Sequence, residues 1–193
     1  MLSLKERFDL LERDLVAKPI RISVHQDLPF AILRYDPDEE WEMRRQLRLR
    51  AAKLASYGKE IVTISLADLL WDAIDKSEGI DAVIQLERER GFEAAQEQVT
   101  TYLSDADWQP LPDLLAERMK ALNPAKHVVF LTRAASMAPA LYQMSKLLEE
   151  MHGRTKVPTI LLYPGTVEGE SGLRFMGCQE RVSPSSYRVK IYS

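Results

Sequence analysis

The chain has 193 residues, of which 46% are hydrophobic and 28% are charged, as is ordinary for a globular protein that buries a substantial core. Its formal net charge of −3 excludes a molecule-wide attraction to DNA, so any nucleic-acid contact would need a local basic patch. A single cysteine, Cys178, excludes an intramolecular disulfide, and no apolar run approaches the ~18 residues of a membrane span. We therefore expect a cytoplasmic protein that makes no contact with a membrane.

The first part of the chain predicts alternating helices and strands. Ser3 followed by Glu6 is a capping-box pattern, and apolar residues at helical spacing follow it until Pro19. A first strand is predicted over PFAILRY, residues 29–35. Asp38 to about Ser56 then predicts a helix with Gly58 at its end, and EIVTISL, residues 60–66, predicts a second strand.

A long helical stretch follows the second predicted strand. ADLLWDAI, residues 67–74, predicts a short helix after Ser65, and the pattern from Ile80 to Leu122 is helical with breaks near Gly91 and residues 108–112. No strand pattern interrupts it, and its length exceeds that of a simple crossover helix. We interpret residues of about 80–122 as a helical insertion at one edge of the sheet, between the second and third strands.

The remaining strands are predicted in the last third of the chain. HVVFLT, residues 127–132, predicts a third strand, and a helix with an apolar stripe from Met137 to Met151 is predicted to begin at Ser136, with Pro139 in its first turn. PTILLY, residues 158–163, then leads to a predicted turn at Pro164 and Gly165. Further strands are predicted at residues 173–176 and 187–193. Without a linker or repeat, residues 1–193 predict one α/β domain with a central, largely parallel sheet flanked by helices.

The motifs of several catalytic classes are missing from the sequence. A nucleotide-hydrolysing P-loop needs closely spaced glycines and a lysine, but the loop after FLT holds Arg133, Ala134 and Ala135, whose Cβ atoms hinder close backbone approach to phosphate. Ser136 lacks the G-x-S-x-G context of a nucleophile and suits a helix cap better. The three histidines lack the paired spacing of a zinc site. We therefore predict no catalytic residue, no metal and no cofactor.

Two loops at the ends of neighbouring predicted strands form the first candidate site. Arg133 and Ser136 follow one strand, and Tyr163 and Gly165 end the next. A right-handed crossover makes such strands parallel and commonly adjacent, and ligands of α/β folds bind at these carboxyl ends. A guanidinium beside a helix start suits a phosphate or carboxylate. The alternatives are an Arg133 paired with an acidic side chain inside the protein and a Gly165 needed only for turn geometry.

The second candidate site is one face of the helix predicted after the first strand. At about 100° per residue, Met43 and Leu47 face the core, whereas Arg44, Arg45 and Arg48 surround Trp41 on the opposite side. A basic patch around an exposed aromatic is typical of a protein interface or of a DNA-backbone surface. The alternative is a solvated face with Trp41 packed on a neighbouring element.

Several segments of the chain closely resemble the BrxB family, the small component of bacterial BREX phage-defence systems. The resemblance is carried, in order, by LPFAILRYDPDEEWEMRRQL, VTISLADLLWDAI, FLTRAASMAPALYQMSKLLEEMHGRTKVPTILLYPGTVEGESGLRFMG and YRVKIYS. Other branches of the family are similar at Thr132 but carry glycine in place of Arg133. The resemblance implies a role beside the system's alkaline-phosphatase-like PglZ protein, its large ATPase and its adenine methyltransferase.

The expected function is therefore that of a non-enzymatic adaptor. The resemblance implies support of both self-DNA methylation and phage exclusion through protein–protein contacts, with direct DNA contact as a further possibility resting on the arginines near Trp41. The alternative is a small-ligand or nucleotide-sensing domain that binds an anion at the Arg133 and Gly165 loops.

Overall fold

The structure is a computed structural model that describes residues 2–23, 28–137, 141–168, 172–176 and 189–193. Cys178, Pro139 and the first two residues of the strand predicted at residues 187–193 lie outside the described residues, while a strand is present at Lys190–Tyr192 within that range.

The core of the fold is a parallel sheet with the strand order β2-β3-β4-β1-β6. Each neighbouring pair along this path is parallel, and a further strand, β5, pairs antiparallel with the end of β4. The predicted α/β class with a largely parallel sheet is therefore confirmed. The strands are β1 (Phe30–Tyr35), β2 (Glu60–Ser65), β3 (His127–Thr132), β4 (Thr159–Glu168), β5 (Gly172–Phe175) and β6 (Lys190–Tyr192).

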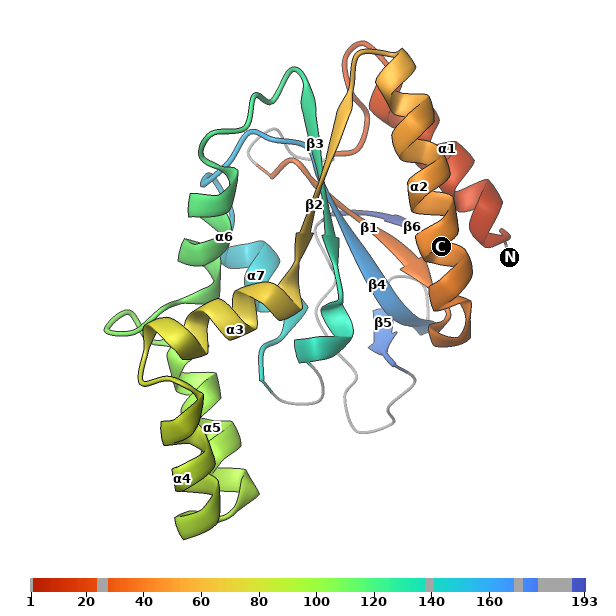
Figure 1. Cartoon of the computed structure of the whole chain (residues 1–193). Helices are drawn as coiled ribbons and strands as arrows, with labels where there is room; N and C mark the ends of the chain where they lie inside the picture. Colours follow the sequence, from red (N-terminus) through yellow and green to blue (C-terminus); the bar gives the residue numbers. More distant parts are fainter. Residues whose placement is uncertain (1, 24–27, 138–140, 169–171, 177–188) are drawn as a thin grey trace.

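Helices cover both faces of the sheet, as Figure 1 shows. One face carries α1 (Leu4–Val16) and α2 (Glu40–Ser56), and the other carries α3 (Leu66–Lys76), α6 (Leu111–Met119) and α7 (Met144–Glu150). Alternate side chains of β1 enter two separate apolar cores, because successive residues of a strand point to opposite faces. The central strands are therefore buried on both sides and read as continuous apolar runs.

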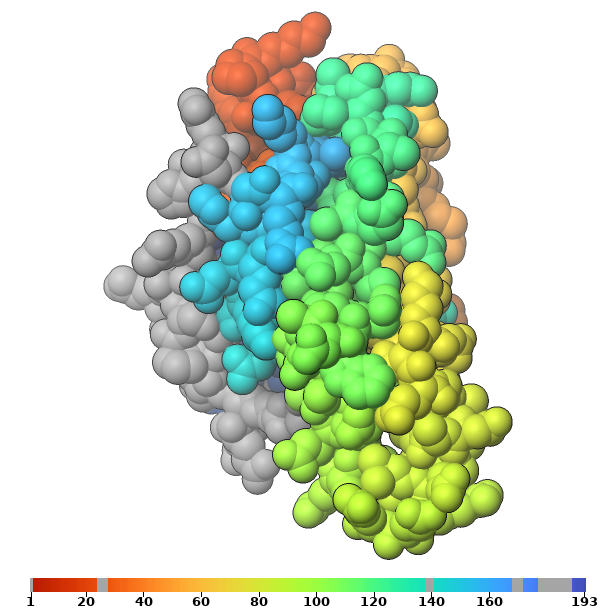
Figure 2. Space-filling view, turned by 90° about the vertical axis from the view of Figure 1, so that its left-hand side faces the viewer, coloured from red at the N-terminus to blue at the C-terminus, as the bar shows by residue number. Residues whose placement is uncertain are grey.

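The helices between β2 and β3 form two different arrangements. The helices α3 and α6 pack in the apolar core on one face of the sheet, beside α7, as the space-filling view of that face shows (Figure 2). By contrast, α4 (Ile80–Arg90) and α5 (Phe92–Ser104) form a hairpin that projects past the carboxyl end of β2 (Figure 1). Val83 is the one buried residue of α4.

The prediction that a helix begins at Ser136 is wrong. A short 3-10 turn, Ala134–Met137, follows β3, and α7 begins only at Met144 with Gln143 as its cap residue. The Ser136 hydroxyl donates to the Arg133 carbonyl oxygen at 2.8 Å, and such local side-chain bonds compete with helix formation. The apolar spacing still predicted burial correctly, because Met137, Met144 and Met151 all lie in the core.

The turn predicted at Pro164 and Gly165 is also wrong. Strand β4 continues through both residues, and Gly165 lies opposite Phe175 of β5. The chain thus runs on as the first arm of an antiparallel hairpin at the carboxyl edge of the sheet.

Candidate functional site

The loop after β3 exposes Arg133 at the carboxyl edge of the sheet. Strands β3 and β4 are adjacent and parallel, as the crossover rule predicts, with Leu131 opposite Leu161. Arg133 itself is exposed and adopts the left-handed backbone conformation, with φ 57°. Within the described part of the chain its guanidinium forms no ion pair. The internal pairing considered above is therefore not found among those residues.

Tyr163 and Gly165, the residues of β4 that were predicted to share a site with Arg133, instead have structural roles. Tyr163 is buried, with 2% exposure, and its ring packs edge-on against Phe175 at 5.2 Å between ring centroids. A Cβ atom at position 165 would lie 2.2 Å from the carbonyl oxygen of Arg174, so only glycine lets the two strands approach. Glycine is needed here for strand contact, which the turn interpretation did not foresee.

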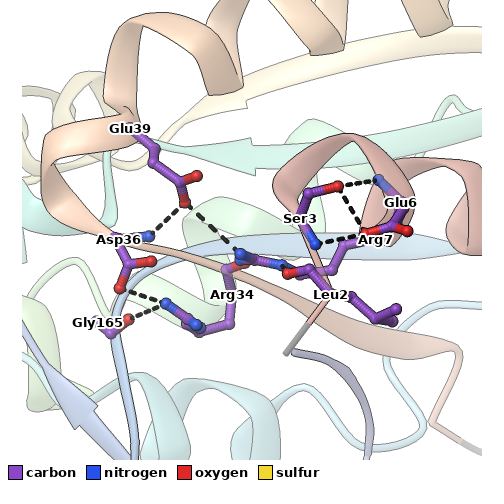
Figure 3. Close-up of polar contacts among 8 residues, drawn as sticks. All are labelled: Leu2, Ser3, Glu6, Arg7, Arg34, Asp36, Glu39 and Gly165. Atoms are coloured by element: carbon purple, nitrogen blue, oxygen red, sulfur yellow. Dashed lines mark hydrogen bonds and ion pairs between the residues drawn. The ribbon is translucent and has the colours of Figure 1, made fainter.

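A pair of buried arginines lies at the same edge, where β1 and β4 end (Figure 3). Arg34 of β1 is 1% exposed, forms an ion pair with Asp36, and donates from Nη1 to the carbonyl oxygen of Gly165 at 3.3 Å. Arg7 of α1 donates from Nη1 to the carbonyl oxygen of Arg34 at 2.5 Å and lies 3.7 Å from Glu39. Two cations and two carboxylates thus join α1, β1 and β4 to the turn that precedes α2.

The electrostatics of this cluster explain why its cations are paired. Burial lowers the pKa of the Arg7 guanidinium, and the neighbouring Arg34 lowers it further, while Glu39 and Asp36 act in the opposite sense. Removal of either carboxylate would leave a poorly compensated charge at the edge of the core. We missed this cluster in the sequence. The available signal was an arginine inside the apolar run FAILRY, where a charge is buried only with partners.

The same junction leads into the first turn of α2. The Tyr35 hydroxyl donates to Glu40 Oε2 at 2.5 Å, and Glu40 Oε1 accepts from Arg44 Nε at 2.7 Å. Burial, followed by the contact with Glu40, raises the pKa of the Tyr35 phenol. Arg44 in turn lies over the ring of Trp41, with its Cζ atom 5.1 Å from the ring centroid. A chain of side chains therefore connects the end of β1 to Trp41.

Trp41 projects into solvent, with 77% exposure. The alternative in which Trp41 packs against a neighbouring element is therefore wrong. Arg45 pairs with Glu42 at 3.2 Å, and Arg48 is exposed with no ion pair to a described residue. On the opposite side Met43 is buried, with 1% exposure, and Leu47 packs against the core, as the spacing predicts. We call Trp41, Arg44, Arg45 and Arg48 the Trp41 patch.

The structure connects the two candidate sites in an unexpected way. Gly165 is joined through Arg34 and Asp36 to the turn that starts α2, and hence to the Trp41 patch. No contact between described residues links the Arg133 side chain to Gly165. The carboxyl edge therefore holds a rigid junction at β1 and β4 and a separate exposed arginine at β3.

The described residues hold neither a cluster of metal ligands nor a helix that could span a membrane. They contain no group of three or more histidine, cysteine, aspartate or glutamate side chains arranged to hold a metal ion. None of their helices is both long and apolar enough to cross a membrane.

Comparison with known proteins identifies one family. A family model described as BREX protein BrxB matches residues 62–190, which is more than half of the 193-residue chain. The matched segment includes Arg133, Ser136, Tyr163 and Gly165, and it begins after the Trp41 patch. No curated protein and no solved structure matches the chain.

Proposed function

This chain belongs to the family of the BREX protein BrxB, and we propose that it serves its BREX phage-defence system as a non-catalytic adaptor. In this role it supports host DNA methylation and phage exclusion by holding other BREX components together. The contact surface is the Trp41 patch, and Arg133 is a second contact at the carboxyl edge of the sheet.

The observation that carries this proposal is the exposure of a tryptophan on a rigid element. Burying a large aromatic side chain on folding is favourable, so a fully projecting tryptophan forgoes that gain in the free protein. Trp41 is held in this position because α2 is anchored through Met43 and through the Tyr35–Glu40–Arg44 contacts. Tryptophan and arginine are the residues that dominate binding energy at protein interfaces, and a preorganised pair loses little entropy on binding.

The local charge favours a protein partner over DNA. Residues 36–48 contain five carboxylates and three arginines, so the start of α2 is acidic overall. Arg44 and Arg45 are each neutralised by a glutamate of the same helix, at 2.7 Å and 3.2 Å. Phosphate backbones bind surfaces with a net positive charge, and each contact releases counterions only if the cation is free. A partner with an apolar pocket for Trp41 and a carboxylate for Arg48 fits this surface better.

We propose the PglZ protein as the first partner, and the large ATPase and the adenine methyltransferase as further candidates. This assignment rests on the family membership and on the part that the resemblance implies for these components. The alternative of an anion site shared by Arg133 and Gly165 has less support, because the Gly165 carbonyl accepts from Arg34 and its Cα faces β5.

The test is a pair of tryptophan substitutions in an intact BREX system. Trp41→Ala should leave the melting midpoint unchanged, because the side chain is exposed, but should weaken partner binding by about 30-fold, as for a hot spot of ~2 kcal/mol. Trp71→Ala is the matched control, because Trp71 is also exposed, with 52% exposure, but lies on α3. Co-purification of the tagged chain with BREX components and plating of phage would be measured in parallel.

Two results would speak against the proposal. Equal co-purification and equal phage resistance of the Trp41→Ala and Trp71→Ala strains would remove the Trp41 patch from the interface. Turnover of a nucleotide or phosphate ester by the purified chain, lost on substitution of Arg133, would contradict a non-catalytic role.

A further inference from the structure

A cavity of about 420 Å³ lies between α1, the loop that follows it and the edge strand β6. Its volume falls within the range of small-molecule sites. Its walls combine apolar side chains with three cationic side chains, one acidic side chain and the terminal residue Ser193; the residues used below are Leu10, Arg13, Asp14, Arg21, Lys190 and Ile191. Neither the BrxB family match nor the proposed interface gives this cavity a role.

One cation of the cavity is already neutralised. Lys190 Nζ lies 2.6 Å from Asp14 Oδ2, which also accepts from the Tyr192 hydroxyl at 2.7 Å. Lys190 additionally donates to the carbonyl oxygen of Arg21 at 3.3 Å. These bonds fix the floor of the cavity and tie α1 to β6, so the site is formed before any ligand arrives.

The other two cations lack a partner among the described residues. Arg13 and Arg21 line the cavity, both are exposed, and neither guanidinium forms an ion pair with a described carboxylate. The backbone of Arg21 is nevertheless held on both sides, since its N–H donates to the Asp14 carbonyl oxygen at 3.0 Å. Arg13 and Arg21 thus add two cationic side chains to a lining whose one acidic side chain, Asp14, is already paired with Lys190.

We propose that this cavity binds a small organic anion, with Arg13 and Arg21 contacting a phosphate or carboxylate group. Guanidinium groups bind both of these planar or tetrahedral anions through two parallel hydrogen bonds. Leu10 and Ile191 supply an apolar wall for the rest of the ligand. Lys190 acts as a positioning residue, because Asp14 already holds it in place.

Substitutions of the two arginines test this anion site. Arg13→Ala and Arg21→Ala should each weaken binding at least tenfold, because each removes a charged hydrogen-bond donor. Arg88→Ala is the control, since Arg88 is exposed on α4 and does not line the cavity.

The experiment is calorimetric titration of the full chain at low ionic strength with phenyl phosphate, benzoate and inorganic phosphate. Saturable binding of phenyl phosphate or benzoate, tighter than that of inorganic phosphate, supports the proposal, and the better of the two identifies the anionic group. Retained affinity in Arg13→Ala and Arg21→Ala, or the absence of saturable binding by all three probes to the unmodified chain, would overturn it. A melting curve of each variant separates lost binding from lost folding.

Discussion

Arg133 combines an exposed side chain with a backbone conformation that suits glycine. At φ 57° an L-amino acid bears a cost of roughly 1–2 kcal/mol that glycine avoids. Glycine would adopt this backbone without strain. A contact made by its side chain would explain why arginine occupies such a position.

Substitution of Arg133 tests whether that contact is external. Arg133→Ala should change the free energy of unfolding by less than about 0.5 kcal/mol, because the lost side chain is exposed. Arg133→Gly should be at least as stable, because it relieves the left-handed strain. Both variants should weaken phage resistance if the guanidinium serves a ligand or partner. A fall of ~3 kcal/mol in chemical denaturation of Arg133→Ala would instead reveal a buried ionic partner.

Gly165 should tolerate no side chain, because an added Cβ would clash with neighbouring atoms. Its added Cβ would lie 2.2 Å from the Arg174 carbonyl oxygen and 2.9 Å from Cε1 of Tyr163. Gly165→Ala should therefore destabilise the protein by about 1–3 kcal/mol, as overpacking does. Thr166→Ala, an exposed neighbour in the same strand, should have little effect. Equal denaturation midpoints for the two variants would show that β5 does not pack against Gly165.

For single residues, the sequence predicted their place in the fold better than the contacts that they make. The candidate residues Arg133 and Gly165 do lie at the carboxyl ends of adjacent parallel strands. The surroundings of Gly165 depend on Arg34 and Arg174, which come from other strands, and local patterns carry no information about such contacts. Arg7 and Arg34 were overlooked for the same reason, since their counter-charges become visible only when α1, β1 and the start of α2 meet.

Among the elements, those with chemical start signals were predicted closely. Ser3 and Glu6 form the expected capping box, and the Ser65 hydroxyl accepts from the N–H of Asp68 at the start of α3. The helix expected from Asp38 begins at Glu40, after a 3-10 turn. Ser136 carried an equally good start signal, yet its hydroxyl bonds back to the preceding turn. A serine thus marks a possible cap, and tertiary context decides which backbone group it contacts.

The contact between α1 and β6 should make stability depend on pH. The pKa of Asp14 lies below its usual value of 3.8: burial would raise it, but hydrogen bonds from Lys190 and Tyr192 and the nearby cations prevail. A carboxylate with a depressed native pKa contributes its full stability above the unfolded-state value. That contribution is lost as the pH falls through the lower native value.

Asp14→Asn isolates this contribution. The free energy of unfolding of the variant should fall below that of the unmodified chain near neutral pH, and the difference should shrink as the pH falls from about 5 to about 2. Glu97→Gln is a suitable control, because Glu97 is exposed on α5 and its carboxylate forms no hydrogen bond or ion pair with a described residue. A difference between Asp14→Asn and the unmodified chain that is constant across this range would contradict the ionic contact.

For the whole molecule, the class of the fold was predictable but the strand order was not. Continuous apolar strands separated by helices predict a parallel sheet, because both faces must be covered. The position of β1 between β4 and β6 depends on which helices pack on which face, and α1 and α2 hold that face together through Arg50, Asp9 and Glu12. Such contacts join residues from different elements, so helical and strand periodicity cannot reveal them.

The insertion between β2 and β3 shows the same limit. The spacing of apolar residues predicts that the insertion is helical. It does not predict which of its helices pack on the sheet and which project from it. Leu111, Leu115 and Met119 of α6 enter the main core, whereas α4, in the projecting hairpin, contributes Val83 as its one buried residue (Figure 1).

In the proposed function, the Trp41 patch is the surface through which this chain contacts another BREX component. The most direct measurement places a photo-activated cross-linking amino acid at position 41, and separately at position 71, in a complete BREX system. We predict a specific cross-link from position 41 to one BREX component, with the PglZ protein expected, and none from position 71. Cross-links from position 71 alone, or from neither position while the system still restricts phage, would contradict the claim.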